Sequence, residues 1–141
     1  MEEIKIGEYI RTKHDYIVKV VNINEWREPS MKYGVEANYL KDIMFIGDNE
    51  ILKHSFNIIN LLEDKDIVIL EYYVSKYRKR IQRKFEIEVF GKDIYFLNYR
   101  CSFLYNKEQQ KFINGKGFNP KIKAIATKEC FSRIEYKLEE K

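Results

Sequence analysis

The 141-residue chain has few of the residues that build cross-linked or repetitive folds: two cysteines, two prolines and six glycines. Two cysteines cannot form the framework of a disulfide-rich domain. Hydrophobic residues make up 45% of the chain, which excludes a disordered or collagen-like protein because so much apolar material must be buried. No apolar run approaches the roughly 18 residues that cross a bilayer. The acidic start, MEEIKIGEYI, is not typical of a secretion signal. We therefore expect one compact domain, residues 1–141, in the cytoplasm, with no membrane contact.

Positive charge is concentrated in one segment. Lysine and arginine number 26 and aspartate and glutamate 22, so the net charge is +4. Residues 76–84 read KYRKRIQRK, with six cations and no anion. Removing six charges from +4 leaves −2 for the rest of the chain, so this segment carries the whole positive excess.

Most of the chain has the composition of short β-strands. The expected strands are rich in β-branched and aromatic residues: 4–10, 16–23, 39–46, 51–54, 67–76, 81–90, 93–98 and 121–126. Residues 25–38 have no clear period and are predicted to form a loop, as are residues 115–120. Short helices are expected at residues 55–62 and 127–133. The fold class is therefore mainly β (α+β), a small twisted antiparallel sheet or barrel with one or two short helices.

The middle of the chain predicts a meander of three antiparallel strands. The segment FEIEVF alternates, which places Phe85, Ile87 and Val89 on one face. The first two strands join near residues 77–80, and the sequence leaves open whether KYRKR forms the hairpin tip or lies on the strands. Residues 102–115 look like a second hairpin with its turn near residues 106–109, and a helix is the rival prediction there.

The residues that could perform catalysis are scattered. His14 and His54 lie in unrelated contexts, and Cys101 and Cys130 are 29 positions apart with no CxxC spacing for zinc. No GxxxxGK[ST] loop is present. The carboxylate pairs on candidate strands fit a solvated face better than acid–base chemistry; they are Asp64 with Asp66 and Glu86 with Glu88. We expect no catalytic residue, no metal and no cofactor, and a protein that is not an enzyme.

The basic segment and its neighbouring tyrosines form the one group of residues whose pattern indicates a binding site. Cations neutralise phosphates and aromatic rings stack on unpaired bases, so a nucleic acid is one candidate partner. An acidic protein surface is another. A third alternative is that the cations only protect an exposed strand edge from aggregation. The candidate binding residues are Lys76, Tyr77, Arg78, Lys79, Arg80, Arg83, Lys84, Tyr72 and Tyr73.

Three segments resemble a group of small uncharacterised accessory proteins of phages and prophages of low-GC Gram-positive bacteria. They are IKIGEYIRTKHDYIVKV (residues 4–20), ILKHSFNIINLLEDKDIVILEYYVSKYRKRIQRKFEIEVF (residues 51–90) and KIKAIATKECFSRIEYKL (residues 121–138). Residues 25–38 and 99–120 fall outside this pattern. The resemblance carries over no known activity and no catalytic residue, but it implies a setting in which short phage proteins block host defences by stoichiometric binding.

These observations lead to a functional expectation. We expect a non-enzymatic, phage-encoded protein that inhibits a bacterial defence component in the host cytoplasm, as anti-CRISPR inhibitors do. Its partner would be a defence protein or a ribonucleoprotein complex. Two alternatives stay open: a regulator that binds nucleic acid, and a sponge that sequesters a nucleotide signal. A homodimer also stays open.

Overall fold

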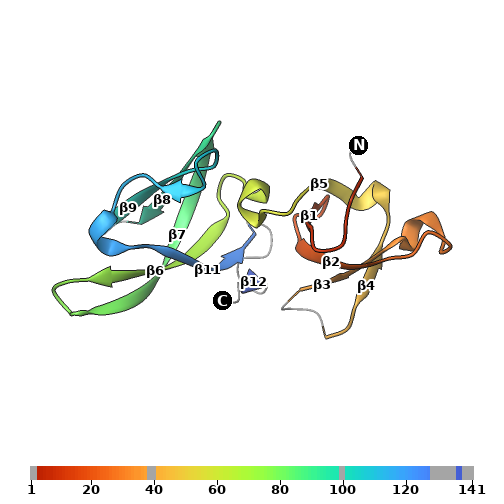
Figure 1. The fold of residues 1–141 in the computed structure, drawn as a ribbon, viewed down its shortest axis with the longest axis horizontal. Helices are drawn as coiled ribbons and strands as arrows, with labels where there is room; N and C mark the ends of the chain where they lie inside the picture. The colour runs from red at the N-terminus through yellow and green to blue at the C-terminus, as the bar shows by residue number, and fades with distance from the viewer. Residues whose placement is uncertain (1–2, 38–40, 99–100, 128–135, 138–141) are drawn as a thin grey trace. The chain divides into compact units, whose positions relative to one another are not determined.

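The chain is mainly β and divides into two compact units, Met1–Leu61 and Leu62–Lys141. The computed structural model describes residues 3–37, 41–98, 101–127 and 136–137. Each unit has its own antiparallel sheet, drawn in red to yellow for the first and in yellow-green to blue for the second (Figure 1). The predicted fold class is confirmed, whereas the single domain over residues 1–141 stays a prediction. Within the described ranges, every helical segment is too short to cross a bilayer.

The first unit is a five-stranded sheet in the order β4-β3-β2-β1-β5. Its strands are β1 (Tyr9–Thr12), β2 (Ile17–Ile23), β3 (Tyr33–Glu36), β4 (Met44–Ile46) and β5 (Ile51–Ser55). The last strand returns to pair with the first, since Ile10 lies opposite both Val18 and His54. Seven aliphatic side chains and one tyrosine, from all five strands and the N-terminal segment, form the core: Ile4, Ile10, Val18, Val20, Tyr33, Val35, Ile46 and Ile51.

Four expectations for this unit were wrong in detail. The strand predicted over 4–10 is β1, which begins only at Tyr9 and continues to Thr12. Residues 25–38 are not one loop, because they contain a 3₁₀ turn, η1 (Pro29–Met31), and strand β3. The strand is only four residues long and Gly34 sits inside it, so it shows no period that a sequence can reveal. The strand predicted over 39–46 is limited to β4, with residues 38–40 outside the described ranges. The helix predicted near 55–62 is the single 3₁₀ turn η3 (Ile58–Leu61), and residues 48–50 form another, η2 (Asp48–Glu50).

The second unit is a seven-stranded sheet in the order β10-β9-β8-β7-β6-β11-β12. The strands are β6 (Ile67–Val74), β7 (Lys79–Phe90), β8 (Asp93–Asn98), β9 (Cys101–Asn106), β10 (Lys111–Phe112), β11 (Lys121–Ala126) and β12 (Tyr136–Lys137). A 3₁₀ turn, η4 (Lys116–Phe118), precedes β11. The predicted meander and the strand at 121–126 are confirmed. Residues 102–115 contain the expected second hairpin, so the rival helix is wrong. The helix predicted over 127–133 falls almost entirely outside the described residues.

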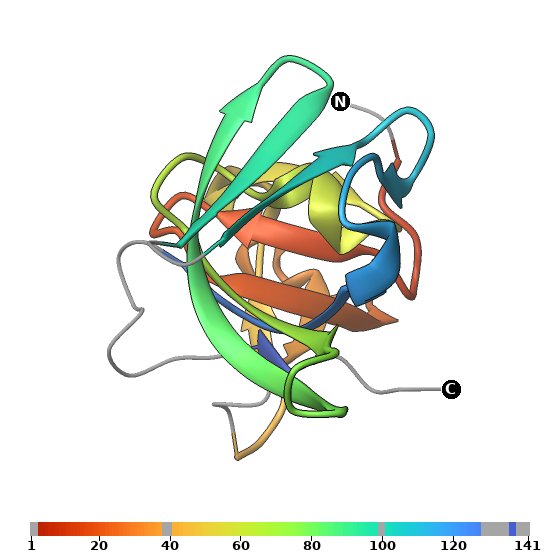
Figure 2. The same cartoon turned by 90° about the vertical axis from the view of Figure 1, so that its left-hand side faces the viewer.

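The core of the second unit lies on one face of its curved sheet. Alternation along β7 buries Phe85 and Ile87 and leaves Glu86 and Glu88 exposed, as predicted. The Phe103 ring is at the centre, with its centroid 5.6 Å from that of Phe85. The curve of the long green strand β7 around this face is visible in Figure 2. Rings from four further segments complete the aromatic cluster: Tyr72, Phe96, Phe112 and Phe118.

Candidate binding surface on the β6–β7 hairpin

The structure places the basic segment partly on the hairpin turn and partly on β7. The backbone N–H of Tyr77 donates to the carbonyl of Val74 at 3.1 Å, and Arg78 closes the turn in the left-handed region at φ 52°. Lys76, Tyr77 and Arg78 therefore lie in the turn, whereas Lys79 begins β7. The turn comes two residues earlier than predicted. In Figure 1 the tip of the hairpin projects past β11 and η4.

The cations of β7 divide between the two faces of the ribbon. Lys79 and Arg83 lie opposite Val74 and Leu70, on the face that carries the core. Arg80 and Lys84 lie opposite Tyr73 and Ile69, on the other face. This division follows from the two-residue repeat of a strand. Positive charge thus occurs on both faces and at the tip of the hairpin.

Tyr72 does not belong to the binding surface. It is only 3% exposed and its ring packs edge-on against Phe85, with 6.0 Å between centroids. Its hydroxyl accepts a hydrogen bond from the Cys101 thiol at 3.6 Å. Burial raises the pKa of Tyr72, the neighbouring Cys101 raises it further and the Arg83 cation opposes the shift. Tyr72 is therefore a core residue, while Tyr73 and Tyr77 are 36% and 50% exposed.

Arg80 fixes the hairpin in place. Its Nε donates to Glu71 Oε2 at 2.8 Å, and a terminal nitrogen donates to the carbonyls of Glu71 at 3.1 Å and Asn119 at 2.8 Å. The hydrogen bond from Arg80 lowers the pKa of the Glu71 carboxyl, with a smaller contribution from Lys123. Arg80 is consequently held by its own chain, with 28% of its side chain still exposed, and its role as a contact residue stays a prediction.

Four of the remaining five cations are open to solvent. Lys76, Arg78, Lys79 and Lys84 are exposed, and no carboxylate of the described residues lies within ion-pair distance of them. The Lys76 ammonium lies 5.9 Å from the centroid of the Tyr77 ring. Arg83 is half-buried beside Tyr72. These exposed groups, with Tyr73 and Tyr77, are what the structure retains of the predicted surface, which we call the hairpin end.

The strand edge beside these cations is partly unpaired. Pairing of β7 with β8 reaches only Glu86 opposite Leu97, and β11 pairs with β6 only as far as Lys121 opposite Glu71. The Asn98 side chain donates to the Lys84 carbonyl at 2.7 Å and covers one further position. The cations could therefore protect this strand edge from aggregation, and an experiment must distinguish that role from binding.

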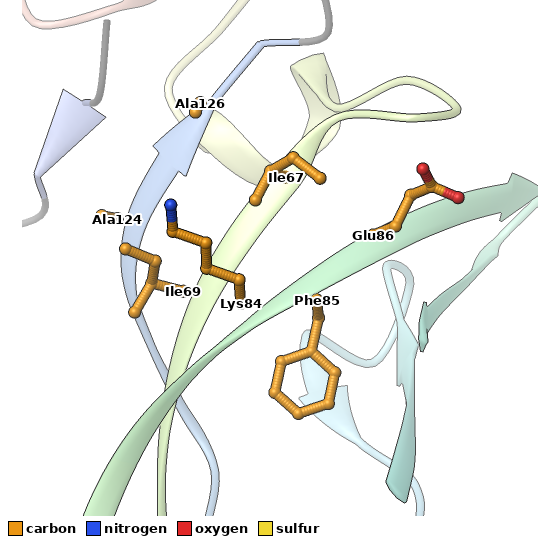
Figure 3. Close-up of a pocket in the computed structure, with 7 residues that line it drawn as sticks. All are labelled: Ile67, Ile69, Lys84, Phe85, Glu86, Ala124 and Ala126. Carbon is orange, nitrogen blue, oxygen red and sulfur yellow. The ribbon is translucent and has the colours of Figure 1, made fainter. Parts of the chain in front are cut away.

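A shallow hollow of about 200 Å³ lies on the outer face of the sheet, next to Lys84. Figure 3 shows its apolar floor, with the Lys84 side chain extending along it and Glu86 turned away. Ile67, Ile69, Ala124 and Ala126 supply that floor. One cation beside an apolar floor is a poor match for the several phosphate contacts that a nucleotide needs.

Two features of the first unit have no signal in the sequence. His54 Nδ1 lies 2.7 Å from Glu8 Oε1, although the two residues are 46 positions apart. Trp26, the one tryptophan of the chain, is 90% exposed in the segment before η1. Only the tertiary pairing of β1 with β5 brings the histidine to the glutamate. Among the described residues, no three His, Cys, Asp or Glu side chains are grouped closely enough to hold a metal.

No protein-family model, no curated protein and no solved structure matches the chain.

Proposed function

We propose that this chain is a non-enzymatic binding protein of phage origin that inhibits a bacterial defence component by occupying it. The resemblance of residues 4–20, 51–90 and 121–138 to phage accessory proteins supports the setting. The hairpin end supports the mode of action, because it presents exposed cations that have no ion-pair partner within the described part of the chain.

The single observation that carries the proposal is the contrast between Arg80 and its neighbours. Arg80 is held by Glu71 and Asn119, so the ribbon is braced before a partner arrives. Lys76, Arg78 and Lys79 extend beyond this brace into solvent. A pre-organised contact surface loses less conformational entropy on binding, which favours affinity and specificity.

The test compares two variants with the same change in net charge. The hairpin variant replaces Lys76, Arg78 and Lys79 by glutamate, and spares Arg80 because a carboxylate there would face Glu71. The control variant makes the same three replacements away from the hairpin, at Lys13, Lys107 and Lys111, and spares Lys92 because a carboxylate there would face Glu108. Each variant exchanges three cations for three anions, so any difference between them reports position and not total charge.

Wild-type protein, expressed in a low-GC Gram-positive host with an active nuclease-based defence, is expected to raise the plating efficiency of a restricted phage. The control variant should retain this effect and the hairpin variant should lose it, at equal protein levels. Restriction that is unchanged by the wild-type protein would contradict the inhibitory function. Full inhibition by the hairpin variant would remove the hairpin end from the mechanism.

A further inference from the structure

The distribution of charge around the hairpin end indicates more than an acidic partner. We propose that this end enters the major groove of double-stranded DNA. The inference rests on the proposed function and names the chemistry of the partner. It applies whether the DNA is free or held by the defence component.

The hairpin end is narrow. Among the described residues, β6 and β7 are the only strands that are hydrogen-bonded to each other from the pair Tyr73–Arg80 outward, because the pairing with β11 ends at Glu71 and that with β8 ends at Glu86. The end is therefore a two-stranded ribbon whose strands are about 4.8 Å apart. The major groove of B-DNA is about 12 Å wide and admits a ribbon of this kind.

The charge near the hairpin end is not confined to one face. Lys79 lies on the core side of the ribbon, and Lys76 and Arg78 occupy the turn. Lys84 lies on the outer side at the base of the ribbon, opposite Ile69, where β6 is also paired with β11. A single-stranded nucleic acid lies along one face and needs rings and cations there together. A groove has phosphates along both of its walls, so it matches cations at the tip, on the core side and at the outer base of an inserted ribbon.

The exposed tyrosines also favour the groove. With Tyr72 buried, the exposed rings are Tyr73 on the outer face and Tyr77 in the turn, and the Lys76 ammonium lies near the Tyr77 ring. Two separated rings do not make a continuous stacking platform. Their hydroxyl groups can instead donate to phosphates or base edges. The deep, narrow major groove of an RNA duplex would exclude the ribbon.

The experiment measures the affinity of the full chain for a fluorescent DNA duplex of about 20 base pairs, two helical turns, by anisotropy at several salt concentrations. Four exposed cations predict a slope of log affinity against log salt near −3.6, which is about a 150-fold loss between about 50 and 200 mM salt. Removing three of them in the hairpin variant leaves a slope near −0.9 and only about a 3-fold loss. The control variant should keep the wild-type slope.

Two further arms test the groove. Single-stranded DNA and duplex RNA of the same sequence should bind at least tenfold more weakly than the DNA duplex. A duplex whose pyrimidines carry bulky C5 substituents, which fill the major groove, should also bind at least tenfold more weakly. A ligand that occupies only the minor groove should leave the affinity unchanged.

Several outcomes would overturn the inference. Equal slopes for the hairpin and control variants would show that the contact lies elsewhere, and tighter binding to the single strand would indicate a stacking surface. Absence of DNA binding, together with loss of inhibition in the hairpin variant, would point to an acidic protein and would leave the proposed function standing. A glutamine version of the hairpin variant, checked by circular dichroism, separates lost binding from lost folding. The glutamine version could aggregate while the glutamate version stays monomeric, with the DNA affinity unchanged in both. The cations would then serve only to protect the exposed strand edge of the hairpin from aggregation.

Discussion

Replacing Gly115 by alanine should destabilise the second unit far more than the same change at the other glycines of this unit. Gly115 has φ 76°, and a Cβ built there would lie 2.7 Å from Cε1 and 2.8 Å from Cδ1 of Phe103. The left-handed conformation costs an alanine about 1–2 kcal/mol. Forcing the Phe103 ring aside costs a further 1–3 kcal/mol, roughly, because that ring is buried among other aromatics. We expect a total near 3 kcal/mol.

Two other glycines separate the two contributions. Gly91 has φ 57° but open space around its Cβ position, so its replacement by alanine should cost only the conformational term, about 1–2 kcal/mol. Gly117 has open space and no such φ, so alanine there should be neutral or stabilising by about 0.5 kcal/mol. Urea unfolding followed by far-ultraviolet circular dichroism gives all three changes in the free energy of unfolding.

A double-mutant cycle tests the cause directly. Combining Gly115→Ala with Phe103→Leu removes the ring that the new methyl group would meet. The glycine replacement should then cost at least 1 kcal/mol less than it does beside Phe103. If Gly115→Ala costs no more than Gly91→Ala, or if the cycle shows no coupling, the packing described around Phe103 is wrong.

Three further predictions concern single side chains. Burial and a hydrogen bond to Asp48 raise the pKa of Tyr33 to about 12, above the value of about 10 in an unfolded chain. As the pH rises from 10 through 12, the free energy of unfolding of the wild type should therefore fall by about 2–3 kcal/mol relative to that of Tyr33→Phe, with no such loss below pH 10. Equal pH dependence of the two unfolding free energies would contradict this. Arg80→Gln should destabilise the second unit by about 1–2 kcal/mol, against less than about 0.5 kcal/mol for Lys79→Gln, which paired urea titrations can measure. Trp26→Ala should change stability by less than about 0.5 kcal/mol because the ring is 90% exposed, and acrylamide should quench its fluorescence almost as well as that of free indole.

The sequence predicts the second unit better than the first, and the reason is periodicity. In β7 the alternation of FEIEVF extends over enough residues to define both faces, and the structure confirms it. In the first unit β3 and β4 have only four and three residues, and Gly34 lies inside β3. These strands are held by the pairing of β3 with β2 and of β4 with β3, which no local pattern records.

The sequence locates the candidate surface but does not show which of its residues are exposed and which are buried or bound within the chain. Composition shows that residues 76–84 carry the positive excess. Whether Arg80 faces a partner or Glu71 depends on the register of β6 against β7 and on the position of Asn119, 39 residues away. Tyr72 and Tyr73 are adjacent in sequence, yet strand alternation buries the first and exposes the second. His54 and Glu8 meet only because β1 pairs with β5.

The central claim is that the hairpin end is the contact surface, and a photocrosslink tests it most directly. A photoreactive phenylalanine analogue is introduced at Tyr77 in one protein and at Lys111 in another, and both are irradiated in infected cells. The account predicts a covalent adduct, to DNA or to a DNA-bound protein, from position 77 and none from position 111. Adducts of equal yield from both positions, or from position 111 alone, would contradict it.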